Sequence, residues 1–340
     1  MRAFITGATG LAGSHLAEQL VARGDEVVAL VRPTSDTRFL QRLGIRMVSG
    51  GLSDQESLQR GMAGADVIFH AAAKVTDWGP WSEFQRDTID GTHRVLEAMR
   101  ATGVRRMVHI SSVAVYGHQA HRGGIWTEDA PYPTQFLAWE YYPAAKIAAE
   151  KLVLGYHQKK WVEASIIRPS WIYGPRDRAS FPRLVRFLKE GPALLIGSGD
   201  NYLSLVYAGN VAEACILAAT KPVALGRVYN VSSDCRVTQR QYFNAVARTL
   251  GLEPVTRSLP IPVAMTVANL IEIPARLLRK KDPPAMSRFG FYIIINQGVF
   301  DCTRAREELG WQPQVGFEEG LARTIEWYKA EYPDHISHSI

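Results

Sequence analysis

The stretch that decides the fold of this 340-residue chain is Thr6-Gly7-Ala8-Thr9-Gly10-Leu11-Ala12-Gly13. It follows a β-rich apolar run at residues 3–6 and precedes a helical pattern that includes Leu16 and Leu20 and stops at Gly24. At a strand-to-helix turn, glycines let the backbone approach a pyrophosphate, and the helix N-terminus offers amides and a positive dipole. The turn therefore predicts a dinucleotide site at Gly7, Thr9, Gly10, Leu11, Ala12 and Gly13.

The pattern that repeats after this turn predicts the fold class. Through about residue 235, short apolar runs alternate with helical patterns, which indicates βαβ units and a parallel sheet covered on both faces. The expected class is α/β, a Rossmann-type doubly wound sheet. Between the third and fourth strands, Ser53-Asp54-Gln55-Glu56 has the capping-box spacing that opens a helix. The strands are predicted at residues 3–6, 27–31, 46–48, 67–71, 107–110, 164–168 and 228–231.

The domain organisation follows from where this alternation fades. After about residue 236 prolines become frequent and the strand-helix pattern is lost. We expect a dinucleotide-binding domain over residues 1–170, to which residues 205–235 return. The segments 171–204 and 236–335 are expected to form a smaller, mostly C-terminal substrate lobe.

Composition narrows the class of protein. With 46% hydrophobic residues the chain can bury a large core. Cys215, Cys235 and Cys302 are far apart and form no Cys-x-x-Cys pair, so neither a disulfide framework nor a metal site is indicated. The first predicted strand begins at once and leaves no room for a signal peptide. We expect a cytoplasmic protein.

The net charge of +6 is spread along the chain, so nucleic-acid binding is not predicted. The exception is Arg276-Leu277-Leu278-Arg279-Lys280-Lys281, which follows an apolar run at 261–271. That run is too short, and too interrupted by Pro262 and Pro274, to span a bilayer. We expect a buried helix with a solvated basic end. Because an interfacial anchor has the same composition, peripheral membrane contact stays open.

The end of the second predicted strand bears on which dinucleotide is bound. An acid there would bind the ribose 2′-hydroxyl of NAD, but Asp25 and Glu26 both come before the strand. Arg32 stands just past the position of the missing acid, where a guanidinium can take the 2′-phosphate of NADP. NADP(H) is therefore predicted, and NAD(H) stays open because Arg32 can also be a solvated strand-end residue.

A candidate proton-transfer pair lies in Tyr142-Pro143-Ala144-Ala145-Lys146. Residues four apart share one face of a helix, so the Tyr142 phenol and the Lys146 ammonium are expected to be neighbours. A nearby cation stabilises a phenolate, whose ordinary pKa is near ~10, and so favours proton exchange near neutral pH. Taken alone, the spacing also fits an ordinary pair on a helix surface.

The chain places hydroxyl groups where open α/β sheets bind ligands. Ser111 and Ser112 directly follow the fifth predicted strand and precede Tyr116 and Gly117. Together with the glycine turn and the Tyr-x-x-x-Lys segment, they resemble the extended short-chain dehydrogenase/reductase family, also called the NAD-dependent epimerase/dehydratase family. The resemblance covers roughly residues 2–235 and continues more loosely over 301–328.

The resemblance implies a role for each matching residue. Ser112 would orient the substrate oxygen, and Tyr142 would be the proton donor and acceptor. Lys146 would hold the nicotinamide ribose and lower the pKa of Tyr142. His70 is expected to be a satisfied strand histidine. The remaining residues expected beside the cofactor are Leu52, Ala71, Ala72, Ala73, Ser111, Pro169 and Ile172.

Three positions depart from the family pattern. Gly51 stands where many relatives have an aspartate that reads the adenine, and Thr88 replaces the usual asparagine. Pro143 directly follows the tyrosine, which a helix tolerates only if Tyr142 lies in its first turn. Because of Gly51, the adenine contact must be made by another residue or be absent. Because of Thr88, the hydrogen bonding at that position is expected to differ from that of the family.

The substrate is predicted to be apolar. Trp171 and Leu203 replace an asparagine and an arginine that are usual in nucleotide-sugar epimerases, which argues against a nucleotide-sugar ligand. The segments 74–81 and 283–289 resemble the 3β-hydroxysteroid dehydrogenase branch, including reductases of long-chain 2-alkyl-3-oxo acids. Four tryptophans are expected to line an apolar pocket: Trp78, Trp81, Trp126 and Trp139.

We therefore expect an NAD(P)-dependent oxidoreductase that interconverts a sterol-like or long-chain ketone and alcohol. The alternatives are a nucleotide-sugar epimerase or dehydratase with tightly bound NAD, and a non-catalytic dinucleotide sensor. A homodimer is compatible with the sequence and is not decided by it.

Overall fold

The computed structural model describes residues 1–340 except 192, 233–235, 279, 281, 285–286 and 334–340. Expectations for Cys235, Arg279, Lys281, Ala285 and Met286 lie outside the described residues.

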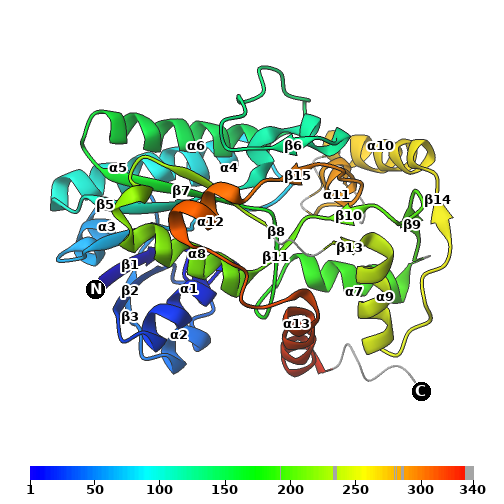
Figure 1. Cartoon of the computed structure of the whole chain (residues 1–340), viewed down its shortest axis with the longest axis horizontal. Helices are drawn as coiled ribbons and strands as arrows, with labels where there is room; N and C mark the ends of the chain where they lie inside the picture. The colour runs from blue at the N-terminus through cyan, green and yellow to red at the C-terminus, as the bar shows by residue number, and fades with distance from the viewer. Residues whose placement is uncertain (192, 233–235, 279, 281, 285–286, 334–340) are drawn as a thin grey trace.

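A seven-stranded parallel sheet forms the centre of the N-terminal part (Figure 1), in the order β12-β7-β5-β4-β1-β2-β3. Every predicted strand is confirmed to within one residue at each end. The expected Rossmann-type doubly wound sheet is thereby confirmed. The bounds are β1 Arg2–Thr6, β2 Glu26–Val31, β3 Arg46–Ser49, β4 Val67–His70, β5 Arg106–Ile110, β7 Glu163–Pro169 and β12 Val228–Val231.

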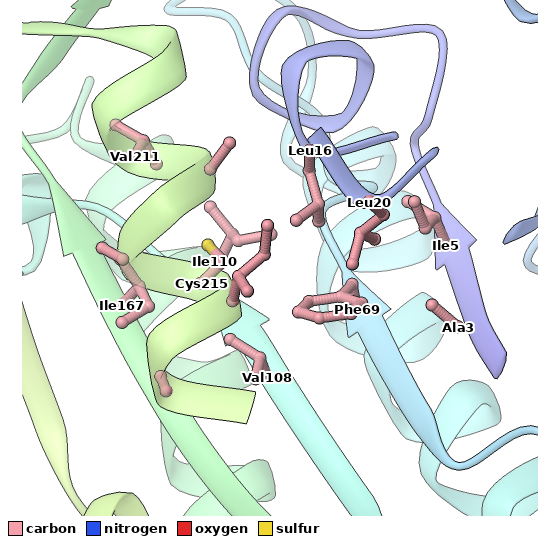
Figure 2. Packing of buried hydrophobic residues seen from close by; sticks show 14 of the residues in the cluster. Ala3, Ile5, Leu16, Leu20, Phe69, Val108, Ile110, Ile167, Val211 and Cys215 are labelled. Atoms are coloured by element: carbon pink, nitrogen blue, oxygen red, sulfur yellow. The ribbon is translucent and has the colours of Figure 1, made fainter. Parts of the chain in front are cut away.

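Helices cover both faces of this sheet, as the near-continuous apolar strands require. One face packs against α1 (Leu11–Ala22), α2 (Arg38–Arg42), α8 (Ala208–Thr220) and α12 (Thr303–Leu309). The other packs against α3 (Gln55–Met62), α5 (Gly91–Thr102) and α6 (Tyr141–Gln158). Figure 2 shows the first of these cores, where Leu16, Leu20, Val211 and Cys215 meet Phe69 and other strand residues.

The start of α3 corrects one sequence prediction. The helix is present, but its N-cap is Asp54, whose carboxylate accepts a hydrogen bond from the Ser57 amide at 3.1 Å. Ser53 therefore lies outside the cap. Ser53 and Asp54 are both residue types that commonly cap helices. The backbone conformation after β3 decides which of the two is the N-cap.

Short elements lie between the longer helices and strands. They include α4 (Trp81–Phe84), the π-helical turn η1 (Gln85–Asp90) and the 3₁₀ turns η2 (Val113–Tyr116), η3 (His118–Arg122) and η4 (Pro222–Ala224). Four two-stranded pairs follow: β6 (Ile125–Trp126) with β15 (Val299–Phe300), β8 (Trp171–Tyr173) with β11 (Leu205–Tyr207), β9 (Leu195–Ile196) with β14 (Ser258–Leu259), and β10 (Tyr202–Leu203) with β13 (Val237–Thr238).

The second lobe has its own apolar core, built largely from helices. Side chains of α7 (Ser180–Glu190), α9 (Gln239–Thr249) and α13 (Phe317–Glu331) form it together with the short strands. A smaller cluster joins α10 (Ile261–Leu277) to α11 (Arg288–Ile294). The residue limits predicted for the two parts stay a prediction.

Helix α10 differs from the expectation of a buried helix. Only Ala264, Ala268, Glu272 and Ala275 are buried, and large apolar side chains on the opposite side face solvent. No helix in the described part of the chain is long and apolar enough to cross a membrane.

Candidate active site

A cleft of about 1270 Å³ opens at the carboxyl end of the parallel sheet and extends along the second lobe. Open α/β sheets bind their ligands at this edge, because the loops after the strands converge there. All the residues predicted for the site line this one cleft. They are Gly7, Thr9, Gly10, Leu11, Ala12, Gly13, Arg32, Leu52, Ala71, Ala72, Ala73, Ser111, Ser112, Tyr142, Lys146, Pro169 and Ile172.

The glycine turn is packed too closely for side chains. A Cβ on Gly13 would lie 2.2 Å from the Gly7 carbonyl oxygen, and one on Gly7 would lie 2.7 Å from the Ala72 amide nitrogen. Gly7 also has a φ of 79°, in the left-handed region. Helix α1 starts directly after Gly10 and has no acidic residue in its first turn. Its first amides are therefore available to an anion, as a dinucleotide pyrophosphate requires.

The end of the cleft beside β2 carries positive charge. Strand β2 ends at Val31, and the next residue, Arg32, is exposed and lines the cleft together with Ser35. Hydrogen bonding to Arg86 is the main cause of a lowered pKa at Asp87, and the charge of Arg32 adds to that lowering. Arg32 and Arg86 therefore both lie close to Asp87 at this end of the cleft.

The candidate acid-base pair sits at the start of α6. The helix begins at Tyr141, so Tyr142 and Pro143 both lie in its first turn, as predicted. Lys146 is one turn further on, with its Nζ 6.0 Å from the centre of the Tyr142 ring. That Nζ donates a hydrogen bond to the Ile110 carbonyl at 2.9 Å, which fixes the lysine under the end of β5.

Two serines follow β5 and face different tasks. The Ser112 hydroxyl caps η2 by accepting a hydrogen bond from the Ala114 amide at 3.1 Å, and it also interacts with the Tyr142 phenol. The Ser111 hydroxyl is buried and has no hydrogen-bond partner among the described residues, and the same is true of Ser170. Because both serines line the cleft, a bound polar ligand can satisfy these two hydroxyls.

Burial dominates the ionisation of the pair. It raises the pKa of Tyr142 to about 12, and the hydrogen bond with Ser112 opposes this only in part. Burial also lowers the pKa of Lys146 to about 8, against the raising effect of Glu150. The expected lowering of the Tyr142 pKa by Lys146 is not seen, because the ammonium is directed to the Ile110 carbonyl. The phenol is therefore protonated at neutral pH, as a proton donor must be.

The comparisons with known proteins agree with this geometry. Residues 3–232 match the profile of the NAD dependent epimerase/dehydratase family. The chain belongs to this family. It is an enzyme of the extended short-chain dehydrogenase/reductase class.

Relatives within the family act on different substrates. The chain is 32% identical over 334 residues to a 2-alkyl-3-oxoalkanoate reductase of Shewanella oneidensis, covering 94% of this chain and 84% of the relative. It is 28% identical over 345 residues to a 3β-hydroxysteroid-dehydrogenase/decarboxylase of Arabidopsis thaliana, covering 95% and 78%. The crystal structure of a double mutant of a dTDP-glucose 4,6-dehydratase from Streptomyces venezuelae with NAD bound superimposes with a TM-score of 0.77, at 25% identity over 98% of each chain.

Two departures from the family pattern are explained by the structure. The Thr88 hydroxyl accepts a hydrogen bond from the Lys74 amide at 3.0 Å, so it supports the loop after β4 in place of the usual asparagine. Gly51 lines the cleft, and a Cβ there would meet nothing within 4 Å. No side chain is therefore present at residue 51 to read an adenine.

The hydrogen-bonding groups of the His70 ring are satisfied, as predicted, by the hydroxyls of Thr6 at 2.7 Å and Thr92 at 3.0 Å.

A buried ion pair lies one helical turn beyond Lys146, and it was not predicted from the sequence. Glu150 lies one turn after Lys146 on α6, and its carboxylate binds the Arg168 guanidinium of β7 at 2.6 Å. Tyr132 donates a further hydrogen bond to Glu150 at 2.6 Å. The i, i+4 spacing of Lys146 and Glu150 could have indicated that the two side chains are neighbours. No local pattern indicated Arg168, the partner of Glu150, because it lies 18 residues further along the chain in β7.

Aromatic side chains from both the dinucleotide-binding part and the second lobe form an apolar wall of the cleft. Trp78, Trp139 and Trp171 line the cleft, and the Phe289 ring packs edge-on against Tyr142 with centroids 5.8 Å apart. Two of the four tryptophans expected to line a pocket do not. Trp81 packs against Tyr141, and Trp126 packs against Tyr116 outside the cleft.

The argument from Leu203 is also corrected. Leu203 is buried in the core of the second lobe and does not line the cleft, so it neither contacts nor excludes a ligand there. Trp171, in contrast, does line the cleft, so its part of the argument stays a prediction. Sequence reasoning could not separate the two, because both lie in short strands and both are apolar.

Proposed function

We propose that this enzyme interconverts a ketone and an alcohol on a long-chain or sterol-like substrate, with NADP(H) preferred over NAD(H). The observation that carries the proposal is the wall beside Tyr142. The aromatic rings of Trp78, Trp139, Trp171 and Phe289 line the part of the cleft formed with the second lobe. Burying an apolar substrate against such a wall is favourable, whereas a sugar hydroxyl there would lose its hydrogen bonds to water.

The residues divide the work of the reaction. A bound nicotinamide cofactor supplies the hydride for reduction or accepts it in oxidation. Tyr142 donates its phenolic proton to the substrate oxygen in reduction and removes that proton in oxidation, while Ser112 holds the same oxygen in place. Lys146 would hold the nicotinamide ribose. Its hydrogen bond to Ile110 gives it a fixed position from which to do so.

The preference for NADP(H) rests on Arg32 and its surroundings. No acidic residue stands at the end of β2, and Arg32 with Arg86 supplies positive charge where the ribose 2′-position is expected. A 2′-phosphate would form charge-assisted hydrogen bonds with a guanidinium, and a 2′-hydroxyl would gain much less. The glycine turn serves both cofactors equally.

A second candidate is nucleotide-sugar epimerisation or dehydration, as in the dTDP-glucose 4,6-dehydratase relative. The observation in its favour is polar: Arg178, Arg183 and Gln239 also line the cleft. Arg178 is paired with Asp36 at 2.7 Å, and Arg183 lies 3.6 Å from Asp77, so both guanidinium groups are already partly neutralised. These contacts weaken the case for a diphosphate ligand.

The test is a substrate panel followed by one substitution. We expect the purified enzyme to consume NADPH with long-chain 2-alkyl-3-oxo acids or 3-ketosteroids, and not with UDP- or dTDP-sugars. Tyr142→Phe should then lower kcat by about a thousandfold, as expected when a general acid is removed, with unchanged NADPH affinity. Tyr141→Phe is the matched control, because its ring lies on the same turn and packs against Trp81.

Three outcomes would contradict the proposal in different ways. Conversion of a nucleotide sugar by protein that retains bound NAD, without turnover of NADPH, would establish the epimerase or dehydratase alternative. Full activity of Tyr142→Phe would remove the tyrosine from the chemistry. NADPH binding without turnover of any ketone or sugar in the panel would favour the dinucleotide sensor.

A further inference from the structure

Helix α10 presents an apolar face to solvent. Its buried residues recur at the spacing of one helix face, and the opposite face carries four large apolar side chains with exposed fractions of 47, 69, 46 and 78%. We call Val263, Leu270, Ile273 and Leu277 the outer face of α10. The only charged residues of the helix are Glu272, which is buried, and Arg276, which is paired with it. A contiguous exposed apolar surface of this kind marks an interaction site.

The outer face of α10 is held in place by the rim of the cleft. Buried Glu272 binds Arg276 at 2.6 Å and Arg288 of α11 at 3.0 Å. Arg276 in turn lies over the Trp78 ring, 4.6 Å from its centre, and donates a hydrogen bond to the Asp77 carbonyl at 3.1 Å. These contacts hold the inner side of the helix against the rest of the protein. The outer face of α10 is therefore directed to solvent.

The same contacts place the helix beside the substrate cleft. Trp78, which lines the cleft, donates its indole N–H to the Lys280 carbonyl just beyond the end of α10, at 2.8 Å. Figure 1 shows α10 at the periphery of the molecule, next to α11. The inner side of α10 therefore lies next to the cleft rim at Trp78, and the outer face lies on the opposite side of the helix.

Basic residues directly follow this apolar helix in the sequence. The helix runs into Arg276-Leu277-Leu278-Arg279-Lys280-Lys281, which contains four basic residues and no acidic one. Lys280 is exposed, and Leu278 beside it is 71% exposed. An apolar helix face that ends in basic residues matches the interface of an anionic bilayer, where acyl chains take the apolar side chains and headgroups take the cations.

We propose that the outer face of α10 docks on an anionic lipid surface, with the helix lying in the plane of the interface. The absence of charge on that face and the basic segment at its end favour lipid over a protein partner. Docking would hold the cleft rim at Trp78 close to the bilayer, so that an apolar substrate could enter without crossing water. This last consequence rests on the proposed function, and the docking itself does not.

The test is co-sedimentation of the full chain with vesicles of phosphatidylcholine alone or mixed with phosphatidylglycerol. We expect binding to the anionic vesicles that weakens with added salt. The double variant Leu270→Glu/Leu277→Glu should lower the partition coefficient by about tenfold or more, since two apolar contacts are lost and two negative charges are added. Lys280→Glu should lower it less. Val223→Glu is the matched control, because Val223 is a similarly exposed apolar residue in η4.

Several results would overturn the proposal. Among them are no binding of the wild-type chain to anionic vesicles, equal binding to neutral ones, and equal binding of the double variant when its melting temperature is unchanged. Concentration-dependent self-association that the double variant abolishes, without vesicle binding, would make this face an interface between copies of the chain. Vesicle binding without faster turnover of a bilayer-embedded ketone would leave docking intact and remove only the substrate-entry consequence.

Discussion

Helices α8 and α10 are similarly apolar in sequence, yet they lie in opposite environments. In α8, nine residues are buried, because the helix packs against both α1 and the central sheet. In α10, four residues are buried, although the helix is longer and contains only two charged side chains. The comparison shows that an apolar run predicts a helix but not its burial. Burial depends on whether another layer is available to cover the second side.

The two regions also differ in how they bury charge. The Glu150–Arg168 pair joins α6 to strand β7 of the central sheet, and both side chains are almost completely buried. Glu272 in α10 is equally buried, but its partners Arg276 and Arg288 are partly exposed. In the dinucleotide-binding part, both charges of this ion pair are shielded from water and neutralise each other. In the second lobe, the arginines that pair with Glu272 remain partly in contact with water.

This contrast gives the largest predicted effect. Glu150→Gln should lower the free energy of unfolding by about 4 kcal/mol, because the buried Arg168 loses its counter-charge. Glu272→Gln should cost only about 1 kcal/mol, since its two arginines can turn toward solvent. Urea denaturation of both variants at neutral pH measures the difference. Equal losses would show that the two regions bury charge in the same way.

Apolar side chains should show the same contrast. Leu16→Ala removes a buried contact between α1 and the core shown in Figure 2, and should cost about 3 kcal/mol. Leu270→Ala truncates an exposed residue of α10, and should change stability by less than about 0.5 kcal/mol. Thermal and urea unfolding check both values. A large loss for Leu270→Ala would mean that α10 is covered in solution.

The buried Lys146 is predicted to lower the free energy of unfolding. No residue of the outer face of α10 is expected to do so. The folded-state pKa of Lys146 is about 8, below the ordinary value of 10.5, so protonation favours the unfolded chain below about pH 8. This penalty fades as the pH rises from 8 toward 10.5, where the unfolded lysine also loses its proton. Lys146→Met should therefore be more stable than wild type by about 2 kcal/mol near pH 7, with the gain shrinking near pH 10.

Urea unfolding of the wild type and Lys146→Met at the two pH values measures this effect. The exposed Lys151→Met, one turn away on α6, is the control for the loss of a lysine. A stability difference between wild type and Lys146→Met that is the same at both pH values would show that burial of the ammonium is not its cause.

The smallest predicted effect concerns the cofactor end of the cleft. Arg32→Ala should weaken NADPH binding by about tenfold and leave NADH binding nearly unchanged, because only NADPH carries a 2′-phosphate. Fluorescence titration with both cofactors measures the ratio, and the exposed Arg60→Ala in α3 is the control. Equal or tighter binding of NADH by the wild type would contradict the assignment of Arg32.

Local patterns were sufficient for the first part of the chain. All seven strands of the large sheet and the first-turn position of Tyr142 were predicted, because strand periodicity, glycine turns and proline placement are local properties. The prediction failed where a side chain's environment depends on distant segments. Trp81 and Trp126 lie outside the cleft, and Leu203 lies in a core. The cap of α3, at Asp54 and not at Ser53, is a local exception, because the two neighbouring residues are both of cap-forming types.

The sequence by itself therefore determined the glycine turn, the order of strands and helices, and the spacing of Tyr142 and Lys146. Each of these depends on backbone geometry over a few residues. Only the tertiary structure decided that Phe289 packs against Tyr142, that Arg168 supports Glu150, and that the apolar side of α10 faces outward. The reason is physical: burial and pairing are set by which distant surfaces meet, and one sequence segment does not contain its partner's surface.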